Sequence, residues 1–386
     1  MALKFIHTAD WQIGRPFKWF PDEMAGRLQA ARLDAIDRIG ALAKTHDARF
    51  VLVAGDVFDA EGLPRKVRLQ PLKRMEAHRD VRWILLPGNH DPAAPGGIWA
   101  KLAEDLPSNV ILADQAEPLE IDPDVTILPA PLRQRVSSHD PTAWMNGCET
   151  KPGVYRIGLA HGSVTGFGSN DDTNALLDPA RATSARLDYL ALGDWHGAVR
   201  VDARTWYSGT PEPDRFSDNE SGHALVVEIG SPGAVPKVEK VRAAQFSWVA
   251  LSEELTNADH LDGLRSRLDD QFSDGPVRAL VRLTLSGGLS ISDLARVKAW
   301  CEVLDAEVAY MAVRDDGLKV RGDLSGHSAF SANPELMAAA EVLRQMEGID
   351  GNGAENGADS ARPRQAQVGL QLLLDAVETA LEEEAA

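Results

Sequence analysis

Cysteine is nearly absent from this chain of 386 residues, which holds only Cys148 and Cys301. Two cysteines so far apart cannot build a disulfide framework or a zinc site made of thiolates, so a reducing compartment is expected. The chain also lacks an uncharged apolar run of the ~18–20 residues that a membrane-spanning helix needs. Its first ten residues, MALKFIHTAD, hold too few apolar side chains for the hydrophobic core of a signal peptide. We therefore expect a cytoplasmic protein that does not enter a membrane.

Positive charge is scarce, with 40 Lys and Arg against 58 Asp and Glu and a net charge of −18. This balance argues at first against a nucleic-acid ligand, because phosphate contacts need Lys and Arg. The charge is uneven, however. Residues 64–82 hold seven basic and two acidic side chains, whereas residues 346–386 hold nine acidic and two basic ones. Whole-chain charge is therefore a weak guide to the ligand.

Short apolar runs alternate with longer amphipathic stretches in the first two thirds of the chain. These runs predict strands at 3–7, 50–54, 81–86, 125–128, 155–160 and 188–192. Between the first two, apolar residues spaced by three and four predict a helix over about 22–44. Such alternation is typical of an α/β fold with a mainly parallel sheet covered by helices on both faces. After about residue 197, closely spaced turns predict an antiparallel closing sheet that runs to the segment FSWVAL.

Turns and composition suggest where the domains divide. The segment 230–233, Gly-Ser-Pro-Gly, is a plausible boundary, and a new pattern of helices and strands begins near residue 257. Residues 347–366 are rich in Gly, Ala, Asp and Asn without periodicity, which is typical of a flexible linker. The expected organisation is a catalytic domain at 1–232, a small α+β domain at 236–330, a helix at 331–346, the linker at 347–366, and a C-terminal helix at 367–386.

Five predicted strands are followed directly by side chains that can bind a metal ion. These side chains are Asp10 and Gln12, Asp56 and Asp59, Asn89 and His90, His161, and Asp194 with His196. In a parallel sheet the carboxyl ends of the strands lie along one edge, where open α/β folds place their ligands. The groups are too many for one ion but suit a pair of divalent ions bridged by one carboxylate.

Each group taken alone has a simpler interpretation. An Asp after a strand is most often a helix cap or a turn residue, and a lone His161 could be a buried, hydrogen-bonded histidine. Five strands that end in the same way do not fit a set of independent caps. The sequence also has no GxxxxGK[ST], HExxH, CxxC pair or GxSxG, so an ATPase that works with this protein would be another chain.

The ordered motifs resemble those of the calcineurin-like metallophosphoesterase superfamily. They are Asp10-x-Gln12, Gly55-Asp56-x-x-Asp59, Gly88-Asn89-His90-Asp91, His161-Gly162 and Gly193-Asp194-x-His196. Within that superfamily, HTADWQIG, AGDVFD, PGNHD and YSGTPEPDRF are similar to segments of SbcD-type DNA repair exonucleases. The resemblance covers residues 7–216. It implies an α/β fold built as a two-sheet sandwich with flanking helices, followed by a small α+β capping domain that faces DNA.

The resemblance also implies a role for each group in the motifs. Asp10, Asp56 and His196 would bind the first metal ion, and Asp56, Asn89 and His161 the second, with Asp56 as the bridge. His90 would be the catalytic histidine that contacts the phosphate or the leaving oxygen. Asp59 would orient His90, although a simple loop cap is an equally good interpretation of Asp59.

Two positions depart from the family pattern, which usually has His where Gln12 and Asp194 stand. Gln12 would offer a neutral oxygen to the first ion, and Asp194 an anionic oxygen to the second. The site then has more oxygen than nitrogen ligands, which favours Mn²⁺ or Mg²⁺ over Zn²⁺, with Fe²⁺ also possible. Mn²⁺ is the expected ion.

The expected substrate is DNA, cleaved by a metal-dependent exonuclease or endonuclease in DNA repair. Basic side chains near the first two motifs, namely Arg15, Lys18, Arg65, Lys66 and Arg68, are candidate DNA contacts. The alternatives are a small-molecule phosphodiesterase or phosphatase, and a weakened scaffold subunit of an ATPase–nuclease complex. Leu370, Leu373, Leu374, Val377 and Leu381 form one helical stripe. By resemblance, this stripe would dock on the coiled-coil base of an SbcC-type ATPase, or else pack on the chain itself or on a second copy in a homodimer.

Overall fold

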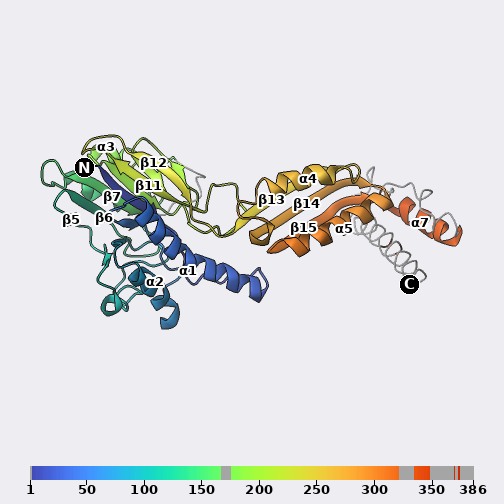
Figure 1. Cartoon of the computed structure of the whole chain (residues 1–386), viewed down its shortest axis with the longest axis horizontal. Helices are drawn as coiled ribbons and strands as arrows, with labels where there is room; N and C mark the ends of the chain where they lie inside the picture. The colour runs from blue at the N-terminus through green and yellow to red at the C-terminus, as the bar shows by residue number, and fades with distance from the viewer. Residues whose placement is uncertain (1, 167–174, 321–333, 348–368, 370–372, 374–386) are drawn as a thin grey trace. The chain divides into compact units, whose positions relative to one another are not determined.

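The computed structural model describes residues 2–166, 175–320, 334–347, 369 and 373. The chain divides into two compact units, residues 1–247 and 248–386, and each is described by itself (Figure 1). The expected linker at 347–366 and C-terminal helix at 367–386 lie outside the described residues, apart from positions 347, 369 and 373.

The first unit is built on two six-stranded sheets. One sheet has the order β12-β11-β1-β2-β3-β4, in which β1 to β4 are parallel and β11 and β12 are antiparallel to their neighbours. Its strands are β1 (Leu3–Thr8), β2 (Val51–Val53), β3 (Trp83–Leu85), β4 (Val110–Leu112), β11 (His223–Ile229) and β12 (Lys237–Arg242).

The second sheet of this unit has the order β5-β6-β7-β8-β10-β9, with β6, β7, β8 and β10 parallel and the two edge strands antiparallel. Its strands are β5 (Leu119–Asp122), β6 (Val125–Ala130), β7 (Tyr155–His161), β8 (Tyr189–Gly193), β9 (Val199–Arg200) and β10 (Thr205–Tyr207). The helices and helical turns of the unit are α1 (Asp22–Thr45), α2 (Arg65–Ala77), η1 (Ala103–Asp105), η2 (Ala143–Gly147) and α3 (Arg181–Ser184).

Successive side chains along a strand of the first unit point to opposite faces of the sheet and so pack into different layers. On β2, Val51 and Val53 belong to the core shared with Ile36 and Ile39 of α1. Leu52, between them, belongs to the core that joins the two sheets. The outer face of the second sheet packs against α3 and η2 through a further cluster. The order of layers is therefore helices, sheet, sheet, helices, and the expected two-sheet sandwich with flanking helices is confirmed.

The interpretation from the residues alone, a mainly parallel sheet covered by helices on both faces, is wrong, because a second sheet and not a helix layer covers one face of each sheet. A strand that is buried on both sides gives the same continuous apolar run whether a helix or a second sheet covers it. The boundary between the units also differs from the prediction between 232 and 236. β12 pairs with β11 in the first unit, whereas β13, expected in a closing sheet, belongs to the second.

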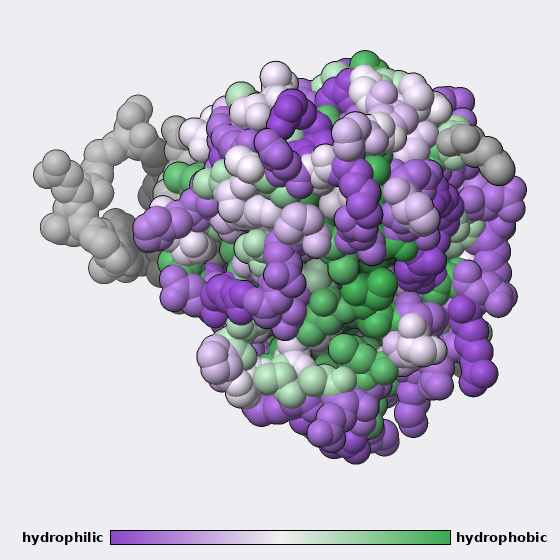
Figure 2. All heavy atoms as spheres, turned by 90° about the vertical axis from the view of Figure 1, so that its left-hand side faces the viewer, coloured by the Kyte–Doolittle hydropathy of each residue, from purple (hydrophilic) through white to green (hydrophobic). Residues whose placement is uncertain are grey.

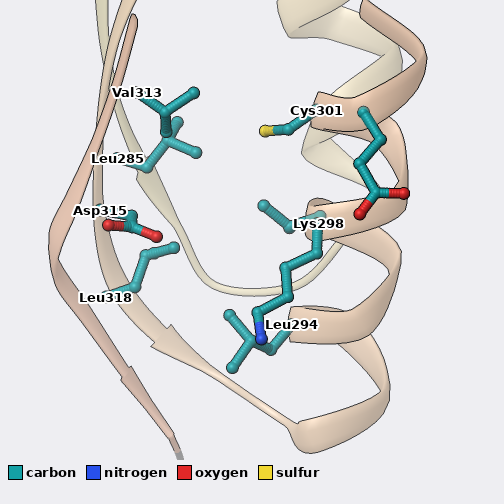
Figure 3. A pocket seen from close by; sticks show the side chains of 9 residues that line it. Leu285, Leu294, Lys298, Cys301, Val313, Asp315 and Leu318 are labelled. Carbon is teal, nitrogen blue, oxygen red and sulfur yellow. The ribbon is translucent and has the colours of Figure 1, made fainter. Parts of the chain in front are cut away.

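The second unit holds a three-stranded sheet in the order β13-β14-β15. Its elements are β13 (Ser247–Leu255), α4 (His260–Asp269), η3 (Pro276–Arg278), β14 (Ala279–Leu289), α5 (Ile291–Glu307), β15 (Tyr310–Val320) and α7 (Pro334–Glu347). β14 and β15 are parallel, and α5 connects them. A pocket of about 240 Å³ lies between α5 and these strands, where Leu294 and Cys301 face Leu285 and Val313 (Figure 3).

The surface of the first unit is mainly polar on the face that Figure 2 shows, with hydrophobic side chains gathered in one hollowed area. Among the described residues, no helix combines the length and the hydrophobicity needed to cross a bilayer.

Candidate metal centre

The loops after β1 and β2 are joined by backbone hydrogen bonds. The N–H of Asp10 donates to the carbonyl of Gly55 at 3.1 Å, and the N–H of Gln12 donates to the carbonyl of Asp56 at 2.9 Å. Asp10, Gln12 and Asp56 all have left-handed backbones, with φ of 54°, 43° and 55°. Such a conformation costs a residue other than glycine ~1–3 kcal/mol and persists where the surroundings enforce it. Here it brings three polar side chains to the ends of two neighbouring strands.

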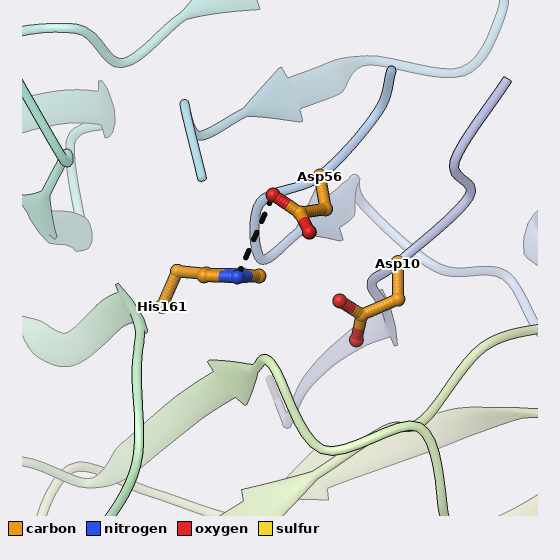
Figure 4. A group of neighbouring side chains, drawn as sticks. All are labelled: Asp10, Asp56 and His161. Carbon is orange, nitrogen blue, oxygen red and sulfur yellow. Dashed lines mark ion pairs between the residues drawn. The ribbon is translucent and has the colours of Figure 1, made fainter. Parts of the chain in front are cut away.

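Asp10, Asp56 and His161 form the centre of the site. One ligand atom from each lies within 4.8 Å of the others, and all three residues are buried (Figure 4). His161 stands at the end of β7 in the second sheet, so the cluster joins the edges of both sheets. Burial raises the pKa of Asp10 to about 7, against the attraction of His196 and His161. Two buried carboxylates side by side are the environment that a divalent cation stabilises.

Three oxygen atoms surround the Nε2 atom of His161. Oδ1 of Asn89 lies at 3.1 Å, Oδ1 of Asp56 at 3.5 Å and Oδ1 of Asp194 at 3.7 Å. The other ring nitrogen, Nδ1, lies 2.8 Å from the carbonyl of Ala54 and donates to it, so Nε2 is left facing the oxygens. Burial acts to lower the pKa of His161, but the nearby carboxylates outweigh it and raise this pKa to about 9. One nitrogen and three oxygens that converge in this way suit a divalent cation.

A second group of contacts surrounds His196, after β8. Its Nε2 lies 3.3 Å from Nε2 of Gln12, and its Nδ1 lies 3.0 Å from Oδ2 of the buried Asp214. The Oε1 of Gln12 accepts from Nη1 of Arg15 at 2.5 Å. Asp10 approaches the same loop, because its carboxylate accepts from the N–H of Asp194 at 3.2 and 3.3 Å. The predicted ligands of both ions are therefore close together.

His90 is held by the backbone of Asp59. Its Nδ1 donates to the carbonyl oxygen of Asp59 at 2.7 Å, and its Nε2 lies 4.0 Å from Oδ2 of Asp56. The carboxylate of Asp59 turns to Arg15 instead, at 3.4 Å. Asp59 therefore contacts His90 through its main chain and not through its side chain.

Two glycines allow the loops to approach this closely. A Cβ at Gly55 would lie 2.2 Å from Nδ1 of His161, and one at Gly88 would lie 2.2 Å from Oδ1 of Asp56. Gly55 also has a φ of 92°, which disfavours any residue with a side chain. The motifs Gly55-Asp56 and Gly88-Asn89 therefore carry glycine because side-chain atoms of His161 and Asp56 fill the space beside them.

The five candidate DNA contacts have different surroundings. Lys18 and Lys66 are exposed, and Arg68 is half-buried. Arg65 pairs with Asp105 at 2.7 Å. Arg15 is only 17% exposed and contacts Gln12, Asp59 and Asp214, so it belongs to the site itself.

Two residues of the site were missed as functional residues. Asp91 is fully buried and accepts from the N–H of Gly88 at 2.7 Å and of Phe58 at 3.1 Å, which joins the loops after β2 and β3. Asp214 contacts His196 and Arg15. Both lie inside segments that carry the family resemblance, PGNHD and YSGTPEPDRF, so the motifs were the available signal.

The chain matches the family described as "Calcineurin-like phosphoesterase" over residues 3–205. The uncharacterized metallophosphoesterase YhaO of Bacillus subtilis (strain 168) is 25% identical over 304 residues, covering 74% of this chain and 72% of YhaO. The SbcD subunit of the nuclease SbcCD from Escherichia coli (strain K12) is 21% identical over 347 residues, covering 72% of this chain and 84% of that protein.

A solved structure, the purple acid phosphatase PPD1 from yellow lupin (Lupinus luteus) seeds, is 13% identical and covers 63% of this chain and 52% of its own, with a TM-score of 0.38.

The family match extends over more than half of the sequence and includes the loops that carry Asp10, Asp56, Asn89, His161 and Asp194. The chain therefore belongs to the calcineurin-like phosphoesterase family.

Proposed function

We propose that this chain is a metal-dependent phosphodiesterase that cleaves DNA, with Mn²⁺ as the preferred ion. The observation that carries the proposal is the convergence of Asp10, Asp56 and His161 within 4.8 Å at the buried edges of two sheets. DNA as the substrate is supported by the similarity to a protein named as a nuclease subunit. Docking of residues 367–386 on an SbcC-type ATPase stays part of the same proposal.

The chemistry divides between the ions and the chain. When bound, a pair of divalent ions lowers the pKa of a water molecule and neutralises the phosphate oxygens. Asp56 would bind both ions, His161, Asn89 and Asp194 would bind one, and Asp10 with His196 the other. The hydrogen-bonded backbones of the β1 and β2 loops fix these side chains before any ligand arrives. Such preorganisation limits the rearrangement needed during the reaction.

His90 is suited to serve the leaving group. Because Nδ1 faces the carbonyl of Asp59, Nδ1 carries a proton, and Nε2 is the atom that faces the site. A proton can be delivered from Nε2 only when the ring is an imidazolium. His90 would then donate to the leaving oxygen as that oxygen gains charge.

Exposed aromatic side chains support a nucleic-acid substrate. Among the described residues, the only aromatic side chains counted as exposed are Trp19, 59% exposed, and Trp195, 37% exposed. Trp195 stands between Asp194 and His196 in the sequence, and the ring of Trp19 lies 5.9 Å from the guanidinium of Arg15. Both therefore flank the site, where a tryptophan can stack on the base of a single strand.

One observation favours a small phosphodiester instead. Of the five predicted DNA contacts, Arg15 and Arg65 are already paired with carboxylates, so only Lys18, Lys66 and Arg68 remain to follow a nucleic-acid backbone. A labelled single-stranded oligonucleotide and an abasic strand of the same length separate the two functions, because both have the same backbone but only one has bases.

The test uses Mn²⁺ and the full chain. Wild type should cleave the strand with bases at the higher kcat/KM. Trp19→Leu and Trp195→Leu should each lower that value by roughly tenfold and leave the abasic strand unaffected, because a stacked base contributes ~1–3 kcal/mol. Trp19→Phe and Trp195→Phe, which keep an aromatic face, are the matched controls. Equal kcat/KM values on both strands, unchanged in the two leucine variants, would refute stacking of bases on Trp19 and Trp195.

A further inference from the structure

Gln12 and Arg15 contact each other in an orientation that chemistry fixes. An arginine has only donors, so the amide oxygen of Gln12 must face it, and Oε1 accepts from Nη1 at 2.5 Å. The NH₂ group of Gln12 then faces Nε2 of His196, 3.3 Å away. Gln12 is therefore engaged at both ends by protein groups.

These contacts belong to a closed ring of four side chains. Arg15 contacts Gln12, Gln12 contacts His196, and His196 places Nδ1 3.0 Å from Oδ2 of Asp214. Asp214 closes the ring, because the same Oδ2 lies 3.1 Å from Nη2 of Arg15. Asp214 is 1% exposed, so its charge needs these partners.

The ring covers Gln12 and His196, two of the groups predicted to bind the first ion. The oxygen of Gln12 accepts from Arg15 and is therefore already occupied. Because Nδ1 of His196 faces Asp214, the lone pair that could bind a metal ion is on Nε2. The NH₂ group of Gln12 covers that atom. A guanidinium beside this position also repels a second cation. Around His161, by contrast, Asn89, Asp56 and Asp194 present oxygen atoms to a nitrogen, and no lysine or arginine contacts them in the described structure.

We propose that Arg15 is a positioning residue that holds Gln12 out of metal coordination, so that the two metal positions are unequal. The position at His161 binds a divalent ion tightly, and the position at His196 binds one weakly. This inference rests on the metal-dependent function proposed above. It assigns Arg15 to the site and not to a DNA backbone.

Calorimetric titration of Mn²⁺ into the chelator-treated full chain, without any substrate, tests whether the positions at His161 and His196 bind Mn²⁺ with different affinities. Wild type should bind in two phases whose dissociation constants differ by roughly tenfold or more. A single phase with two equivalent ions per chain would overturn the proposal. Absence of DNA cleavage would refute the proposed substrate but would leave this binding result unchanged, so the two failures are distinguishable.

Two amide variants test the role of Gln12. Because Gln12 is not a ligand in this account, Gln12→Ala should leave the weaker phase unchanged or tighten it by uncovering His196. Asn89→Ala, the matched amide control, should weaken the tighter phase. Gln12→Ala weakening the weaker phase by about tenfold would show that Gln12 is a ligand and would overturn the proposal.

A third variant tests the ring itself. Arg15→Met removes the cation and releases the oxygen of Gln12, so the weaker phase should tighten, whereas the exposed Lys18→Met should change neither phase. If Arg15→Met leaves the weaker phase as it was, Arg15 does not control this position. Circular dichroism of each variant establishes that it is folded before titration.

Discussion

Gly193 ends β8 where the two sheets of the first unit approach each other, and replacing it with alanine should disrupt the metal centre. A Cβ at this position would lie 2.0 Å from the carbonyl oxygen of Ala54 and 2.8 Å from Nδ1 of His161. The atom at 2.0 Å is backbone, so it cannot move aside as a flexible side chain can. The strand ends must separate or the His161 ring must turn, which breaks its hydrogen bond to Ala54.

The cost can be estimated from overpacked cores, where one added methyl group costs ~1–3 kcal/mol. Because a backbone carbonyl is the obstacle, we expect Gly193→Ala to lower the free energy of unfolding of the first unit by about 3 kcal/mol. Gly230→Ala is the matched control, since a Cβ there meets no atom within 4 Å. It should change stability by no more than about 0.5 kcal/mol.

Urea unfolding, followed by the intrinsic fluorescence of the nine tryptophans, which include the buried Trp11 and Trp83 of the first unit, measures the stability of both variants. Mn²⁺ titration then shows whether Gly193→Ala also loses the tighter binding phase, as a displaced His161 requires. If Gly193→Ala is as stable as Gly230→Ala and binds Mn²⁺ as wild type does, the close approach of the two sheets at this point is wrong.

Two further outcomes are expected. Burial lowers the pKa of His7 to about 3 from its ordinary 6.5, so the folded state resists protonation and the free energy of unfolding falls as the pH drops below 6.5, by about 2 kcal/mol at pH 5. In urea unfolding, a His7→Gln variant should lose less free energy of unfolding than wild type between pH 7 and pH 5. Equal losses would exclude His7 as the cause. Asp59→Asn should reduce turnover much less than His90→Gln, because the main chain of Asp59 holds His90; steady-state rates on a phosphodiester compare them, and equal losses would show that the carboxylate is required.

The places of the candidate ligands at the ends of strands could be predicted, because each buried strand is a short apolar run and the next side chain is polar. Asp10 after β1 and His161 at the end of β7 were found in this way. Partners distant in the sequence could not be predicted. Nothing in the local pattern around Asp214 shows that it contacts His196 and Arg15, since that contact depends on how the two sheets pack.

Which strands pair with each other could not be predicted from the sequence either. β12 and β13 were both recognised as strands, yet one belongs to the first unit and the other to the second. The alternation of residues specifies which faces of a strand are buried and leaves open which strand lies beside it. Gln12 is a further example, because its place after β1 could be predicted but its contact with Arg15 could not.

Hydrolysis should depend on metal ions held by Asp10, Asp56 and His161, and cleavage of a labelled single-stranded DNA by wild type and Asp56→Asn tests this dependence. Wild type should be inactive after chelation and should recover on addition of Mn²⁺, whereas Asp56→Asn, which lacks the charge of the shared carboxylate, should stay inactive at the same Mn²⁺ concentration. Cleavage by chelated wild type would show that the reaction needs no metal ion, and cleavage by Asp56→Asn at the wild-type rate would show that Asp56 does not hold one.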